Sequence, residues 1–158
     1  MDFQSVEALY SYVQNQILIG AESVGEHIKE LLKDYVDTMW YSVHTPEEYH
    51  RTMQFINSIS VKTPILIGNT IQVEVYFDEG KIAPSMDNRG FWNQHMGVNG
   101  EDVSGNIPRY IEEGNNSSLY SYNGIHMTKE TEDFCRVNNV PVKLMVDYLK
   151  ANGIECTG

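Results

Sequence analysis

The sequence has few of the residues that build disulfide frameworks or membrane spans. Its two cysteines, Cys135 and Cys156, form no CxxC pair and no secretory framework, so we expect two reduced thiols. The longest apolar stretches, such as residues 65–67, are far shorter than the roughly 20 residues that cross a bilayer. The first residues contain no basic segment followed by an apolar one. We therefore expect a protein that is made in the cytoplasm and does not contact a membrane.

Motifs that mark catalytic or cofactor sites are also absent. The sequence contains no GxSxG, P-loop or GxGxxG pattern, and its five histidines do not follow HxxxH or HExxH spacing. Among the carboxylates, Glu113 has the most distinctive setting, directly before Gly114, although a residue of a helix C-terminal turn would look the same. We expect no enzymatic activity, no catalytic residues, no cofactor and no metal, with a hydrolase or metalloenzyme as a minor alternative.

Basic residues are scarce. Eleven Lys and Arg stand against 22 Asp and Glu, which gives a formal net charge of -11. Proteins that bind nucleic acid tightly present Lys and Arg patches to the phosphates, and this sequence contains none. An acidic surface keeps a protein soluble, and it would also let DNA pass through the lumen of a ring without specific binding. The residues alone leave both roles open.

A long apolar stripe dominates the first quarter of the chain. Its members recur every three or four residues, which predicts one face of an α-helix over about residues 5–42. Glycines at positions 20 and 25 predict a bend or break. The helix is longer than a small domain needs, so we expect part of the stripe, including Ile28, to face another subunit. The stripe consists of Val6, Leu9, Val13, Ile17, Ala21, Val24, Ile28, Leu31, Tyr35 and Met39.

The middle of the chain predicts a second helix and a hairpin. Thr45 is a good N-cap for a helix that reaches about Asn57. Alternating residues then predict antiparallel strands at about 58–63 and 70–78, joined by residues 64–69. Residues 79–106 lack periodicity and are predicted to form a long loop that is mobile until a neighbour orders it. Phe91 and Trp92 in this loop are candidate interface residues, with a small satellite core as the equal alternative.

The last third predicts short helices. Residues 107–113 form a helical turn closed by Gly114, and polar residues 115–123 follow. A helix capped by Thr128 ends near residue 138, another runs from Pro141 to a cap at 152–153, and Ile154 with Cys156 suggests a final strand. We thus expect an α+β fold in a single structural domain, residues 1–158, with a long N-terminal helix packed on a small antiparallel sheet.

Four segments, in this order, resemble a family of tailed-phage neck, tail-completion and head–tail joining proteins, which includes proteins akin to the minor tail protein Z of lambda-like phages. The first contains Arg51-Thr52 and Asn57-Ser58, and the second is the strand that ends at Asp78. The third is the turn from Pro108 through Tyr110 to Glu113 and Gly114. The fourth is the C-terminal stretch 149–154.

The resemblance implies a structural virion protein with no catalytic residues. It implies a closed ring at the head–tail junction, in contact with head-completion and tail-terminator proteins. Rings of this kind are commonly sixfold, matching the symmetry of the tail. As scaffold, Arg51 would hold a carboxylate or helix end, Asn57-Ser58 would cap the switch from helix to strand, and Gly114 would permit a tight turn. The alternative from another class is a small acidic cytosolic binding or regulatory protein of phage or bacterial origin.

Overall fold

The computed structural model describes residues 3–43, 53–82, 104–116 and 121–156. The chain divides into two compact units, each built from separate stretches of sequence. Unit 1 comprises Met1–Glu30, Val61–Val75 and Glu132–Gly158, and unit 2 comprises Leu31–Ser60 and Tyr76–Thr131. The predicted α+β class is confirmed. The placing of residues 1–158 in a single structural domain stays a prediction.

The predicted N-terminal helix is confirmed and is continuous. Helix α1 spans Val6–Val36 and continues into a π-helical turn, η1, over Asp37–Tyr41. The Oγ of Ser5 accepts a hydrogen bond from the backbone N–H of Ala8 at 3.1 Å, which satisfies one of the free donors of the first turn. Of the predicted bend or break at the two glycines, the break is wrong, because neither Gly20 nor Gly25 interrupts the helix, and the bend stays a prediction.

The two glycines allow other elements of unit 1 to pack closely against α1. A Cβ on Gly25 would lie 2.7 Å from methyl carbons of both Val61 and Val73, at the base of the hairpin. A Cβ on Gly20 would lie 2.7 Å from the ring of Tyr148 and 2.8 Å from the sulfur of Met145. Both distances are too short for real side chains, so glycine lets the hairpin and the C-terminal helix approach α1.

The hairpin is longer than the sequence predicted, because the connection is itself a strand. Strand β1 (Ile59–Val61) pairs with β4 (Val75–Phe77), and β2 (Ile65–Ile67) pairs antiparallel with β3 (Thr70–Gln72). Residues 64–69 were predicted as a plain connection because three consecutive aliphatic residues show no alternation. The turn falls at Gly68, whose φ of 61° favours glycine.

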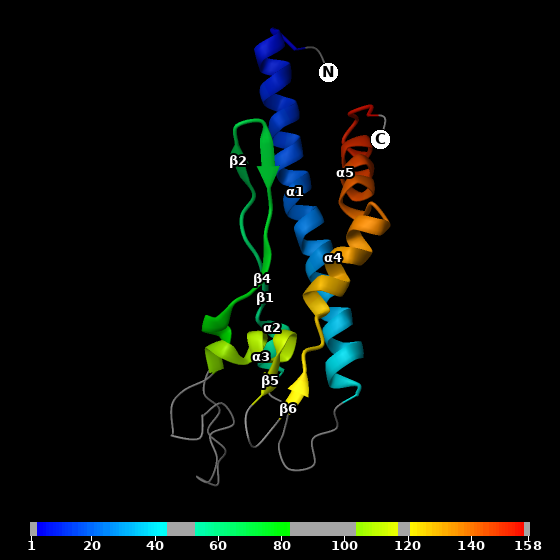
Figure 1. The fold of residues 1–158 in the computed structure, drawn as a ribbon. Helices are drawn as coiled ribbons and strands as arrows, with labels where there is room; N and C mark the ends of the chain where they lie inside the picture. The colour runs from blue at the N-terminus through cyan, green and yellow to red at the C-terminus, as the bar shows by residue number, and fades with distance from the viewer. Residues whose placement is uncertain (1–2, 44–52, 83–103, 117–120, 157–158) are drawn as a thin grey trace. The chain divides into compact units, whose positions relative to one another are not determined.

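Within unit 1, the β2–β3 hairpin and the last helix lie beside α1 (Figure 1). Helix α4 spans Met127–Val137 and crosses from unit 2 into unit 1, and α5 spans Val140–Ala151 within unit 1. Ala21, Val24, Cys135 and Leu149 are the buried hydrophobic residues of this unit. The predicted final strand is wrong, since residues 154–156 form no strand. The predicted cap at 152–153 is confirmed, with a φ of 75° at Gly153.

Unit 2 contains short elements around its own core. Helix α2 spans Gln54–Asn57, and residues 44–52, where we predicted its start, lie outside the described residues. Two 3₁₀ turns, η2 (Glu79–Lys81) and η3 (Ser104–Asn106), flank residues 83–103, so most of the predicted loop also lies outside them. The buried hydrophobic side chains of the unit are Leu32, Val36, Tyr41, Phe55, Ile59, Ile82, Ile111 and Met127.

The rest of unit 2 begins with helix α3. It spans Ile107–Glu113, as predicted, and ends at Gly114. The segment that follows, which the sequence identified only as polar, contains an antiparallel pair of strands, β5 (Gly114–Asn116) and β6 (Ser121–Asn123). The predicted cap at Thr128 is also wrong, because α4 already begins at Met127 and the backbone N–H of Thr128 bonds to a distant carboxylate.

Candidate interaction surface

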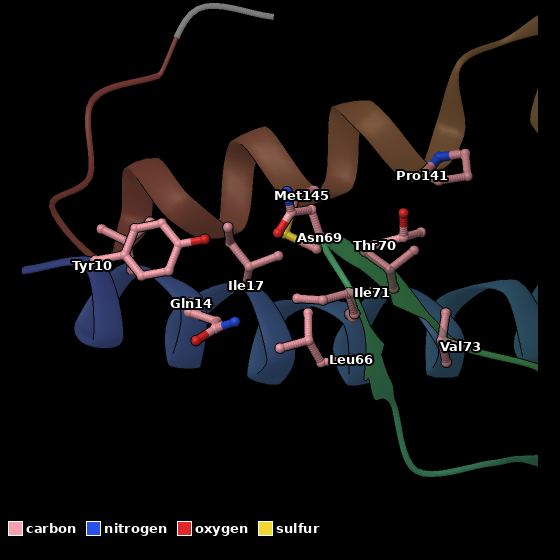
Figure 2. Close-up of a pocket in the computed structure, with 13 residues that line it drawn as sticks. Tyr10, Gln14, Ile17, Leu66, Asn69, Thr70, Ile71, Val73, Pro141 and Met145 are labelled. Atoms are coloured by element: carbon pink, nitrogen blue, oxygen red, sulfur yellow. The ribbon is translucent and has the colours of Figure 1, made fainter. Parts of the chain in front are cut away.

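Unit 1 contains an apolar groove between α1, α5 and the β2–β3 hairpin. Its volume is about 460 Å³. Figure 2 shows Ile17 of α1, Met145 of α5, and Leu66 and Ile71 of the hairpin gathered around it. Most of the other lining residues are also apolar, with Gln14, Asn69 and Thr70 as polar exceptions. A site of this composition suits an apolar partner surface.

The groove follows from the apolar stripe and the two glycines. Val13, Ile17, Ala21 and Val24 follow one another at helical spacing and all line it. The hairpin base packs against α1 at Gly25, and α5 packs against it at Gly20. Near the N-terminal part of α1, the Tyr148 hydroxyl donates to Oε1 of Gln16 across 3.4 Å. The hairpin and α5 are thus both held against α1, and the groove is the space left between them.

Exposed apolar side chains are concentrated in the same unit. Among the described residues, 11 of the 13 exposed large hydrophobic side chains belong to unit 1, and the other two belong to unit 2. Of these 11, five lie in or just before α1, three lie on β2, and three lie on α4 and α5. Large exposed apolar areas mark sites of protein contact. Those of unit 1 are Phe3, Val6, Leu9, Tyr10, Ile19, Ile65, Leu66, Ile67, Phe134, Val137 and Val142.

Of the two candidate residues at the end of α2, Ser58 takes part in a series of polar contacts inside unit 2. Ser58 is completely buried, and its hydroxyl donates to the carbonyl oxygen of Phe55 at 2.6 Å, at the point where helix becomes strand. The hydroxyl of Ser60 donates to the carbonyl of Ser58 at 2.9 Å and accepts from the Lys81 ammonium at 2.6 Å. Asn57 is exposed beside this series. These contacts tie strand β1 to the turn at η2.

Aromatic packing supports the same corner. The rings of Phe55 and Phe77 stack with their centroids 4.9 Å apart and their planes within 9°. The backbone N–H of Asp78 donates to the carbonyl of Ser58 at 2.9 Å and extends the β1–β4 pairing by one bond. A Lys and two Ser in contact invite comparison with a Ser–Lys catalytic pair, but here the ammonium is a donor and both hydroxyls donate onward to carbonyls. The arrangement is that of a structural clamp.

The segment from Pro108 to Gly114 contains helix α3 and the residue at which strand β5 begins. Pro108 is buried at the start of α3, and the guanidinium of Arg109 lies 5.5 Å from the centroid of the Tyr110 ring. Tyr110 is half-buried, and Glu113 is exposed. Gly114 has a φ of 88° and a ψ of 170°, a conformation that other residues rarely adopt.

Glu112, one residue before the carboxylate that the sequence singled out, has a defined partner far along the sequence. Its side chain accepts the backbone N–H of Thr128 at 2.9 Å and so caps the first turn of α4. The backbone N–H of His126 donates to the Glu112 carbonyl at 3.3 Å. Gly124 is required here, because a Cβ at that position would lie 2.0 Å from the same carbonyl oxygen. Only the fold brings these residues together, so the sequence carried no local signal.

The remaining candidate residues are placed as follows. Ile28 is half-buried on α1, in unit 1. Arg51, Thr52, Phe91 and Trp92 lie outside the described residues. Their predicted roles at an interface and in the scaffold stay predictions.

Other chemistry in the described ranges is limited. Burial raises the pKa of the Cys135 thiol, while Cys156 is half-buried and contacts the carbonyl of Val146 at 3.8 Å. No group of three or more His, Cys, Asp or Glu side chains able to hold a metal ion occurs in these ranges. None of the helices described combines the length and hydropathy that crossing a membrane requires.

The described residues thus define a small α+β protein with an apolar groove and exposed apolar side chains in one of its two units. Residues 5–151 match the family model YomN, and the chain belongs to this family of phage-derived proteins. Comparison with curated proteins and with solved structures gives no match.

Proposed function

We propose that the chain is a structural virion protein of a tailed phage and that it forms part of the neck, where the head joins the tail. Membership of a phage-derived family sets the context for this proposal. The four segments that resemble neck and tail-completion proteins suggest the particular role. The role is structural, with no catalytic step and no cofactor.

The observation that carries the proposal is the concentration of exposed apolar side chains in unit 1, the unit that also contains the apolar groove. A protein that works alone rarely exposes a large contiguous apolar area, because contact with water is unfavourable and promotes aggregation. In an assembled virion the same side chains would be covered by neighbours. We propose that these neighbours are further copies of the chain in a ring, and head-completion and tail-terminator proteins above and below it.

The charge of the chain is compatible with a ring around DNA. A formal net charge of -11 repels phosphate groups, so the genome would pass through the lumen without specific binding. A protein that grips DNA would instead carry Lys and Arg toward the phosphates. The proposal therefore places this protein in the virion, after assembly in the host cytoplasm, with no role for a membrane.

Deletion of the gene from the phage that encodes the chain tests this role. We expect electron microscopy of the lysate to show DNA-filled heads and separate tails, with few joined particles. Addition of the purified chain to the lysate should restore joining and infectivity. Normal numbers of joined, infectious particles from the deletion phage would contradict the neck role. The same phage with altered host growth or altered lysis would favour the regulatory alternative.

A further inference from the structure

The β2–β3 hairpin has apolar side chains on both of its faces. Successive side chains of a strand point to opposite faces, and Leu66, at the centre of β2, lines the groove. Ile65 and Ile67 therefore belong to the other face, and they are 54% and 57% exposed. Within the described residues, β2 pairs with β3 alone. An exposed edge with aliphatic side chains and no guarding charge is a hazard unless a partner covers it.

The groove has the size and chemistry to accept that outer face. An apolar cavity of about 150 Å³ holds one benzene-sized group. At about 460 Å³ the groove has room for the two isoleucine side chains and part of the strand that carries them. Its lining is mostly aliphatic, and Gln14 offers an amide for the backbone of an incoming strand.

The charge pattern favours a second copy of the same chain as the occupant. Two copies that each carry a net charge of -11 repel one another over most of their surfaces. Residues 63–73 contain no charged side chain, and the groove lining contains none either. The two surfaces can therefore meet without opposing carboxylates or removing a charge from water. A basic partner would instead favour exposed acids at the contact.

We propose that Ile65 and Ile67 of one copy dock into the groove of a second copy. The inference rests on the proposed ring and names the two surfaces that would join neighbouring subunits. The contact is heterologous, because the hairpin face and the groove are different patches of one chain. Each copy both offers a hairpin and receives one, so the contact repeats from subunit to subunit and can close into a ring.

Two variants, each blocking one surface, test this contact in the purified chain. Ile67→Asp places a carboxylate on the hairpin face, and Gln14→Arg places a long charged side chain in the groove. We expect wild type to form oligomers in sedimentation velocity and each variant alone to associate about 100-fold more weakly, because a charge in an apolar contact is poorly solvated. A mixture of the two variants should form a one-to-one dimer and nothing larger, since one intact hairpin then meets one intact groove.

A matched control separates this contact from a general loss of apolar surface. Val142 is 55% exposed on α5 and does not line the groove, so Val142→Asp should associate like wild type. Circular dichroism should show unchanged helix content in all three variants. A wild-type chain that stays monomeric at every accessible concentration would overturn the proposal. Association of Gln14→Arg alone as strong as that of wild type would overturn it too, because it would indicate a contact that does not use the groove.

The tests of contact and of function can fail separately. If the mixed variants form the expected dimer but the deletion phage still joins heads to tails, the neck role is wrong and the contact stands. If the deletion phage fails to join while both variants associate like wild type, the contact is wrong and the neck role stands.

Discussion

Replacing Gly25 with alanine should destabilise unit 1 although it removes a glycine from a helix. In an open helix this change stabilises by about 1 kcal/mol. Here the added methyl would lie 2.7 Å from a methyl carbon of Val61 and 2.7 Å from one of Val73, where ordinary contacts measure 3.4–4 Å. Valine side chains have stiff χ1 angles, so neither can turn away cheaply. Overpacking costs about 1–3 kcal/mol, and two simultaneous contacts place this case near the upper end.

The net effect should be a loss of about 2 kcal/mol in the free energy of unfolding, once the helix-propensity gain is subtracted from the overpacking cost. At roughly 2–4 °C per kcal/mol for a chain of this size, the melting temperature should fall by about 4–8 °C. Urea titration followed by circular dichroism measures the free energy directly. Ser23→Ala, at an exposed position of α1, is the control and should be neutral or slightly stabilising.

A second substitution tests the stated cause. Val73→Ala alone should destabilise slightly, because it removes half-buried methyl groups. In the Gly25→Ala background it also removes one of the two close contacts, so the double variant should be more stable than the sum of the single effects predicts. If Gly25→Ala instead raises the free energy of unfolding as Ser23→Ala does, the close approach of hairpin and helix is refuted.

Three further predictions concern unit 2 and the cysteines. Glu112→Ala should lower the free energy of unfolding by about 0.5–2 kcal/mol through loss of the α4 cap, whereas Glu113→Ala, at an exposed position, should have little effect; urea titration of both compares them. Gly114→Ala should cost about 1–3 kcal/mol in the same titration, because its φ of 88° is strained for alanine, and an unchanged value would contradict this geometry. A maleimide at pH 8 should label Cys156 before Cys135, because burial shields the Cys135 thiol and raises its pKa, and equal labelling rates in the folded chain would argue against burial. Because the pKa of Cys135 is higher in the folded than in the unfolded chain, raising the pH through the thiol range should lower the free energy of unfolding.

The sequence predicted the elements that depend on local patterns. Helix α1 follows from an apolar stripe with helical spacing, which any long amphipathic helix displays. The end of α3 at Gly114 and the end of α5 at Gly153 follow from the freedom of glycine to adopt positive φ. In each of these cases the physical cause lies within a few residues of its effect.

Features that depend on distant residues were missed. Gly20 and Gly25 were interpreted as helix breakers because their partners, on the hairpin and on α5, are far away in sequence. Glu112 could not be distinguished from Glu113, since its bond to Thr128 spans 16 residues. The groove combines residues from three separate segments, so no local motif marks it. Strand β2 was overlooked because its three aliphatic residues do not alternate with polar ones.

The most direct test of the neck role is to locate the chain in purified virions. An affinity tag on the chain, introduced into the phage genome, can be labelled with gold particles and imaged by electron microscopy. The account predicts one cluster of gold at the junction of head and tail on each particle, and none on the capsid or the tail tip. Label elsewhere on the virion, or purified infectious particles that lack the chain altogether, would contradict it.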